Sequence, residues 1–181
     1  RQKTNRLAAY PLLMPCLIQP KNWSNFADGG FYTERLSNIK AVKTKGNDYS
    51  KEFDDENPEV FYVALNALQG TENGINEVVL EAANYCWNTN TQVGGLIDAA
   101  DYYRSKSFFH VHQADVTGRL YAVSGSFNPQ GTDLTRGLHQ FKKGAPIKNE
   151  KDRNWLCIAG ANHWGMNKTS YKERIDWANN E

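Results

Sequence analysis

The sequence lacks the features that mark several classes of protein. Its three cysteines, Cys16, Cys86 and Cys157, are widely spaced and form no Cys-x-x-Cys pair, which argues against a disulfide scaffold or a zinc ribbon. No stretch approaches the roughly 18 apolar residues of a membrane span, and no signal peptide with a cleavage site is recognisable. The 21 basic and 20 acidic residues leave a net charge of +1, so bulk positive charge for binding nucleic acid is missing too. These absences predict a cytoplasmic protein without a membrane partner, which recognises any phosphate through a few placed cations.

The composition that remains is that of an ordinary folded domain. Apolar residues make up 40% and charged residues 23% of the 181 residues, which is enough for one core of usual size. Turn-forming residues are frequent over positions 1–50, where short strand-like runs occupy 30–32 and 39–43. This first part is therefore predicted to consist of strands and loops.

A helical hairpin is predicted next. A charged, solvated segment over 51–56 leads to the helix-start signature Asn-Pro-Glu at 57–59, and Gly70 ends that helix. Apolar residues with helical spacing over 75–86 predict the second helix. The other expected elements are a helix over 96–106, strands over 108–112 and 120–127, a turn over 128–131, and helices over 133–143, 150–160 and from the capping box at Ser170 onward.

The most informative stretch is Asp115-x-x-Gly118-Arg119-x-Tyr121, which lies between two strand-like runs. Aspartate hydrogen-bonds turn backbone well and glycine accepts a positive φ, so the spacing predicts a tight turn in which Asp115 also orients Arg119. Side chains alternate along a strand, so Arg119 and Tyr121 should share a face. A guanidinium beside an aromatic ring suits nucleic acid, because the cation binds phosphate through two hydrogen bonds and the ring stacks on a base.

The same residues allow a purely structural interpretation. Asp115 and Arg119 could form an ion pair across the turn and have no ligand. Arg136, in the first turn of the next expected helix, could bring a second cation to the same groove, and Lys142 lies at a helix end that is either solvated or in contact with nucleic acid.

This region is similar to a known family. The stretch 115–121, together with the Asn-Pro-Gln-Gly element and its surroundings over 127–138, closely resembles the single-subunit DNA-dependent RNA polymerases of bacteriophages and mitochondria. The likeness continues downstream over 143–147, 155–162 and 171–175. Upstream matches, which would be weak alone, lie at 15–23, 29–32, 57–60 and 75–80, and all keep the same order along nearly the whole chain.

The resemblance implies an α+β chain that forms an incomplete right-hand polymerase fold. Residues 1–50 would end an N-terminal domain, 51–107 would hold the helical hairpin with a shortened thumb-region connection, and 108–181 would form the outer palm. In that family the Asp-x-x-Gly-Arg element contacts the template strand and the RNA–DNA hybrid, so Arg119 would bind phosphate and Tyr121 would line the template path. The candidate nucleic-acid contacts are then Arg119, Tyr121, Arg136 and Lys142, and the candidate motif-orienting residues are Asp115, Gly118 and His112.

The family's catalytic groups have no match in this sequence. Two palm aspartates that bind two Mg²⁺ ions, and a fingers helix for the incoming NTP, lie downstream of the last matching segment. We therefore expect no catalytic residue and no metal ligand here, and a second subunit that supplies the Mg²⁺ site and binds the NTPs. The chain would be the small subunit of a heterodimeric phage RNA polymerase, inactive alone, in the cytoplasm of the infected bacterium. A truncated polypeptide, a stand-alone nucleic-acid-binding accessory module and a fragment of a family A DNA polymerase are the alternatives.

Three tryptophans near the C-terminus add to the expectation of a partner. A chain that ends within the palm would expose apolar surface there, and such surface marks protein interfaces. The residues expected to bury this interface are Trp155, Trp164 and Trp177.

The histidines suggest two further alternatives. His110-x-His112 is similar to the metal-binding pair of rolling-circle nucleases, for which Tyr171 would be the nucleophile. A zinc site built on Cys157 and His163 is the second alternative, but it lacks the number and spacing of ligands that zinc needs. We prefer the simpler interpretation, in which His112 packs or hydrogen-bonds beneath the Asp-x-x-Gly turn.

Overall fold

The computed structural model describes residues 13–33, 36, 38–44, 59–87, 91–125 and 127–180. The charged segment and helix-start residues predicted over 51–58 lie outside these ranges. The chain forms two compact units, Arg1–Lys143 and Gly144–Glu181, which are described one at a time. Helices and two small sheets mix along the chain, which confirms the α+β class.

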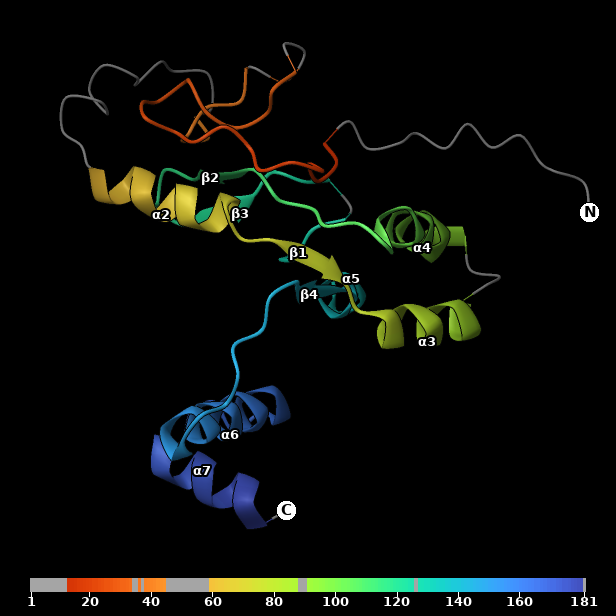
Figure 1. The fold of residues 1–181 in the computed structure, drawn as a ribbon, viewed down its shortest axis with the longest axis vertical. Helices are drawn as coiled ribbons and strands as arrows, with labels where there is room; N and C mark the ends of the chain where they lie inside the picture. The colour runs from red at the N-terminus through yellow and green to blue at the C-terminus, as the bar shows by residue number, and fades with distance from the viewer. Residues whose placement is uncertain are drawn as a thin grey trace, which may run out of the picture. The chain divides into compact units, whose positions relative to one another are not determined.

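Both sheets of the first unit are antiparallel pairs (Figure 1). Strands β1 and β4 pair Gly74 with Gln140, and strands β2 and β3 pair Gln113 with Tyr121. The elements of this unit are α2 (Glu59–Gln69), β1 (Asn73–Ile75), α3 (Glu77–Trp87), α4 (Thr91–Tyr103), β2 (His112–Ala114), β3 (Leu120–Ala122), α5 (Asp133–Leu138) and β4 (His139–Phe141).

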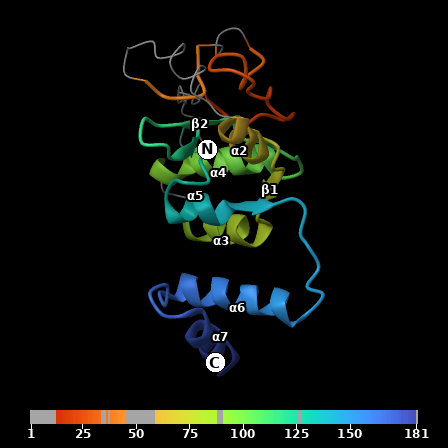
Figure 2. The same ribbon diagram turned by 90° about the vertical axis from the view of Figure 1, so that its left-hand side faces the viewer.

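The larger core of this unit lies where α3, α4 and α5 meet the β1–β4 pair (Figure 2). Each helix contributes a fully buried aliphatic side chain, namely Leu80, Ala100 and Leu138. The ring of Tyr103 stacks on that of Phe127 at 5.7 Å between centroids. Because these residues come from distant parts of the sequence, the core ties the helical hairpin to the segment that carries β2 and β3.

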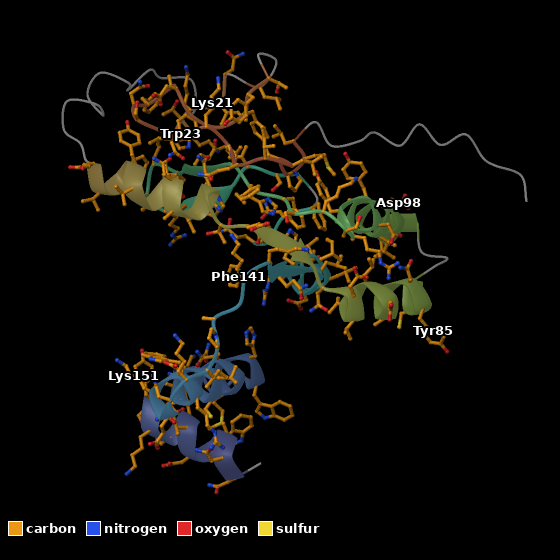
Figure 3. The ribbon with its side chains drawn as sticks, in the orientation of Figure 1. Lys21, Trp23, Tyr85, Asp98, Phe141 and Lys151 are labelled. Atoms are coloured by element: carbon orange, nitrogen blue, oxygen red, sulfur yellow. The ribbon has the colours of Figure 1, made fainter. Side chains whose placement is uncertain are left out.

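Trp23 anchors a second core in which the N-terminal segment packs against α2 (Figure 3). Its side chain is 1% exposed, and Nε1 donates to Oε1 of Gln69 at 3.0 Å and to the carbonyl oxygen of His112 at 3.1 Å. The amide of Gln69 donates in turn to the carbonyl oxygen of Lys21. A Cβ at Gly29 would collide with the indole ring, so glycine is needed there. Trp23 and Gln69 thus join the N-terminal segment, α2 and β2.

The helix predicted over 133–143 is wrong in its second half. Helix α5 ends at Leu138, and the next three residues form β4. The amide of Gln140 donates to the carbonyl oxygen of Ile75 at 2.8 Å, and the carbonyl oxygen of Leu138 accepts from Asn76. Pairing with a strand more than 60 residues away therefore overrides the local helical pattern.

Other boundaries also differ from the sequence prediction. The strand predicted over 120–127 shortens to the three residues of β3, and the helix predicted over 96–106 runs instead from Thr91 to Tyr103. The strands expected at 30–32 and 39–43 reduce to isolated bridges at Gly30 and Val42. These are short segments whose conformation is set by tertiary neighbours.

The second unit is a pair of helices, α6 (Glu150–Trp164) and α7 (Tyr171–Asn180). Asn149 caps α6, and Gly165 ends it with a φ of 105°, where a left-handed conformation favours glycine. The predicted capping box of α7 is confirmed, because the backbone N–H of Ser170 donates to the Glu173 carboxylate at 2.8 Å.

One guanidinium holds the connection between these two helices. Arg174 donates to Oδ1 of Asn162 at 2.8 Å, and also to the carbonyl oxygens of Asn167 and Thr169. Two of the segments that resemble the polymerase family, 155–162 and 171–175, thus contact each other directly.

Candidate nucleic-acid interface

The carboxylate of Asp115 organises the turn between β2 and β3. Its Oδ1 accepts from the backbone N–H and the hydroxyl of Thr117, at 2.8 and 2.6 Å, and from the backbone N–H of Arg119 at 3.0 Å. These hydrogen bonds, the Thr117 hydroxyl first, hold the pKa of Asp115 below its usual value. The turn predicted from the sequence is therefore present, and Asp115 fixes the backbone of Arg119.

Gly118 supplies the backbone conformation that this turn requires. Its φ is +79°, and a Cβ built there would meet nothing within 4 Å. The replacement Gly118→Ala should therefore cost about 1–2 kcal/mol of local stability through backbone strain alone. Hydrogen exchange of a peptide over 112–122 would measure this loss. Gly144→Ala is the matched control, because its Cβ is equally free and its φ is not positive; equal exchange in both variants would contradict the prediction.

Arg119 and Tyr121 face solvent at the start of β3. The guanidinium of Arg119 is exposed and forms no ion pair among the described residues, and the side chain of Tyr121 is 40% exposed. Asp115 contacts Arg119 through the backbone N–H, and the Arg119 charge also helps to lower the pKa of the Asp115 carboxyl. The two side chains form no direct ion pair, and the exposed guanidinium is available to bind a phosphate.

The Asn-Pro-Gln-Gly element clamps the hairpin. The Gln130 side chain accepts from the backbone N–H of Ala122 at 2.8 Å and donates to the carbonyl oxygen of Leu120 at 3.0 Å, so it pairs with the free edge of β3 as a strand would. Asn128 donates to the carbonyl oxygens of Ala122 and Ser124, which ends the strand. The sequence predicts a turn here but not the hydrogen bonds of Gln130 to β3. An amide side chain shortly after a predicted strand is the signal that could have indicated them.

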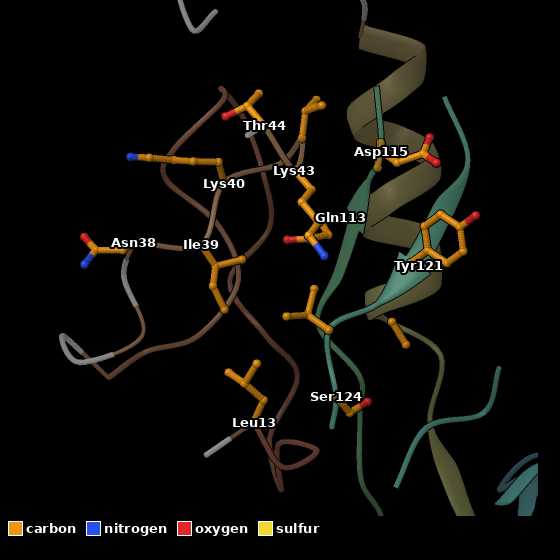
Figure 4. Close-up of a pocket in the computed structure, with 14 residues that line it drawn as sticks. Leu13, Asn38, Ile39, Lys40, Lys43, Thr44, Gln113, Asp115, Tyr121 and Ser124 are labelled. Atoms are coloured by element: carbon orange, nitrogen blue, oxygen red, sulfur yellow. The ribbon is translucent and has the colours of Figure 1, made fainter. Parts of the chain in front are cut away.

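A groove of about 710 Å³ lies between the hairpin and the N-terminal segment (Figure 4). Gln113 and Tyr121 line it from the hairpin, while Lys40 and Lys43 line it from the opposite side. Sequence reasoning misses both lysines, although they stand in the strand-like run over 39–43. The groove therefore adds cations to the neighbourhood of Tyr121.

None of the three predicted cations, Arg119, Arg136 and Lys142, lines this groove. Arg136, on α5, contacts the Asp133 carboxylate at 3.3 Å and is about half exposed. Lys142 follows β4, where its backbone N–H donates to the carbonyl oxygen of Glu72. Neither side chain lines the groove, and a role for them in binding nucleic acid stays a prediction.

A buried chain of hydrogen bonds lies beneath the hairpin. Nδ1 of His139 faces the carbonyl oxygen of Thr135 at 2.6 Å and must carry the proton, so its Nε2 accepts from Nε2 of His110 at 3.1 Å. Nδ1 of His110 then accepts from the Ser124 hydroxyl at 2.8 Å. Burial, together with the neighbouring imidazoles, lowers the pKa of His110 to about 3. The His110 imidazole in this series of hydrogen bonds is therefore uncharged at neutral pH.

His112 is also buried and has its own partners. Its backbone N–H donates to Gln69, and Nδ1 lies 3.0 Å from the carbonyl oxygen of His110. Burial lowers the pKa of His112. The two imidazoles thus turn to different partners, which argues against the metal pair of a rolling-circle nuclease.

The described residues form neither a metal-ion cluster nor a membrane-spanning helix. No group of three or more His, Cys, Asp or Glu side chains is placed to hold a metal ion. None of the described helices is long and apolar enough to cross a membrane.

Known proteins share this sequence over most of its length. It is 28% identical over 216 residues to the T7 RNA polymerase of Escherichia phage T7, a match that covers 91% of this chain. It is 26% identical over 228 residues to DNA-directed RNA polymerase 1, mitochondrial, of Arabidopsis thaliana, which covers 96% of this chain. The chain is a homologue of the single-subunit phage and mitochondrial RNA polymerases. The resemblance seen in the sequence is thereby confirmed.

Similarity to this polymerase family is higher over part of the chain. The mitochondrial DNA-directed RNA polymerase of Neurospora crassa is 38% identical over 82 residues, or 45% of this chain. The chain spans about a quarter of the length of the T7 and Arabidopsis polymerases, 24% and 23% respectively. No family model matches it.

Proposed function

We propose that this chain is one subunit of a DNA-directed RNA polymerase and contributes the outer palm and contacts to the template and the RNA–DNA hybrid. The observation that carries the proposal is the β2–β3 hairpin, whose turn is fixed by Asp115 and Gly118 and leaves Arg119 unpaired and exposed, in a homologue of phage RNA polymerases. A fixed guanidinium beside an aromatic ring suits a nucleic-acid backbone. The three-part division at residues 50 and 107 belongs to the same proposal.

The catalytic centre would be completed by a second polypeptide. Polymerase chemistry needs carboxylates that bind Mg²⁺. The partner would supply this Mg²⁺ site and bind the NTPs, in the cytoplasm of an infected bacterium. Exposed aromatic side chains on the second unit support a partner interface, since Trp155 is 52% and Trp164 75% exposed. The third predicted residue, Trp177, is half-buried, with its ring 5.8 Å from that of Trp164.

The thumb region would be shortened in this chain. The match to the phage T7 enzyme runs over 216 residues, although it takes in 91% of these 181 residues. The relative therefore carries residues within the matched region that this chain lacks. A connection over 89–109 that is shorter than the thumb of the family would account for residues of this kind.

Reconstitution tests the division between two chains. Mixing this chain with the polypeptide that carries the metal-binding aspartates should give templated RNA synthesis, with neither chain active alone. Synthesis by this chain in isolation would contradict the proposal. Salt-dependent binding to DNA, with no added synthesis in the mixture, would favour the stand-alone accessory module instead.

Arg119 provides the sharper test of the interface. Arg119→Gln should reduce extension of a preformed RNA–DNA hybrid by the mixture about tenfold or more, because a charge-assisted phosphate contact worth about 1.5–3 kcal/mol is lost. Extension is measured on a fixed scaffold, so promoter recognition plays no part. Arg153→Gln, an exposed arginine of the second unit, is the control and should extend normally. Unchanged extension by folded Arg119→Gln would remove this residue from the interface.

A further inference from the structure

The N-terminal segment is fixed against β2 by backbone hydrogen bonds. The backbone N–H of Ala114 donates to the carbonyl oxygen of Ala41 at 2.8 Å, and that of Lys43 donates to the carbonyl oxygen of Ala114 at 2.7 Å. Val42 and Ala114 form a parallel bridge. The segment therefore joins β2 at a single bridge, which fixes its backbone beside the hairpin.

Polar side chains gather beside this bridge. Val42 and Ala114 pack against Phe26, and their chain neighbours Lys43 and Gln113 line the groove. Gln113 pairs with Tyr121 across the hairpin, and paired residues share a face. The same side chains line the groove beside the hairpin (Figure 4). One continuous surface thus joins the N-terminal segment to the proposed template contact.

The charge of this groove is positive. Lys40 and Lys43 line it, and neither takes part in an ion pair among the described residues. Asp115 is the acidic side chain among the lining residues, and its Oδ1 is occupied by Thr117 and by the backbone of Arg119. The two ammonium groups are therefore free to contact phosphates.

We propose that this groove binds single-stranded nucleic acid, with Lys40 and Lys43 on successive phosphates and the Tyr121 ring stacked on an unpaired base. The inference rests on the proposed function and extends it to the N-terminal segment, which forms the second wall of the path. A volume of about 710 Å³ is that of a ligand-sized pocket. Stacking on Tyr121 requires an exposed base face, which a duplex does not offer without unstacking.

The test measures binding of the full-length chain to a fluorescein-labelled 12-nucleotide single strand and to the corresponding duplex. The double variant Lys40→Gln/Lys43→Gln should bind the single strand about tenfold more weakly, and the slope of log K against log salt should fall by about 1.4, since each lost phosphate contact removes about 0.7. The matched control Lys168→Gln/Lys172→Gln changes the net charge equally with exposed lysines of the second unit. It should bind within about twofold of the wild type.

A second variant addresses the base contact. Tyr121→Leu should weaken single-strand binding by at least about fivefold, because stacking on an aromatic ring is worth about 1–3 kcal/mol per base. Photocrosslinking of a 5-bromodeoxyuridine strand should label Tyr121. Hydrogen exchange of β2 in each variant shows whether the hairpin stays folded.

The outcomes separate this inference from the proposed function. If Arg119→Gln weakens binding and the Lys40/Lys43 variant behaves like its control, the template contact stands and the groove is wrong. If the chain binds neither strand and Arg119→Gln leaves extension unchanged, both proposals fail. A duplex that binds as tightly as the single strand, with the same sensitivity to Lys40 and Lys43, would overturn the single-strand assignment.

Discussion

Replacement of Trp23 by alanine should lower the free energy of unfolding of the first unit by about 3–5 kcal/mol, the cost of removing a large buried aromatic side chain. Its ring is 1% exposed and packs over Gly29, whose lack of a Cβ makes the close approach possible. The indole N–H also joins Gln69 on α2 to the carbonyl oxygen of His112 on β2. The variant therefore loses packing and leaves buried polar atoms short of a partner.

Hydrogen exchange of a peptide over 59–69, followed at increasing urea concentrations, would measure the loss of unfolding free energy in α2 specifically. Trp23→Phe keeps most of the packing and should fall between the wild type and Trp23→Ala. Trp155→Ala is the control, because that side chain is 52% exposed in the second unit and should change this exchange by less than about 0.5 kcal/mol. Similar stability of Trp23→Ala and Trp155→Ala would show that Trp23 does not join these elements.

Acid should destabilise the first unit through its buried imidazoles. In the folded state the pKa of His110 is lowered to about 3 by burial and by His139 and His112, and burial lowers those of His139 and His112 as well. Unfolded histidines titrate near 6.5, so below that pH the unfolded chain binds more protons and stability falls as the pH falls. His110 alone should cost about 2 kcal/mol between pH 7 and pH 5.

The double variant His110→Phe/His139→Leu removes both imidazoles of the direct contact, so that neither is left without a partner. Between pH 7 and pH 5 it should lose at least about 2 kcal/mol less than the wild type in urea unfolding, since His139 contributes in the same direction as His110. His163→Gln is the control, because this fourth histidine is exposed in the second unit. If the free energy of unfolding depends on pH equally in the double variant and the wild type, His110 and His139 do not cause the loss of stability in acid.

The part of the candidate site that could be predicted is the part encoded locally. Asp115 and Gly118 lie within one turn, and short-range hydrogen bonding and a positive φ follow from their residue types. Contacts between residues distant in sequence could not be predicted in this way. Lys40 and Lys43 reach the groove through a bridge to β2 some 70 residues away, and no spacing rule connects the two segments.

The sequence by itself determined the homology to RNA polymerases and the α+β class, which rest on patterns along most of the chain. It also determined the turn after β2 and the capping box at Ser170 of α7, because each of these depends on residue identity within a few positions. Tertiary structure decided that α5 stops at Leu138, that Gln130 pairs with the edge of β3, and that His110 meets His139. In each of these cases a hydrogen-bonding group finds its partner across a contact that chain folding creates. A buried polar group must be satisfied wherever such a partner stands, and local preference yields to that requirement.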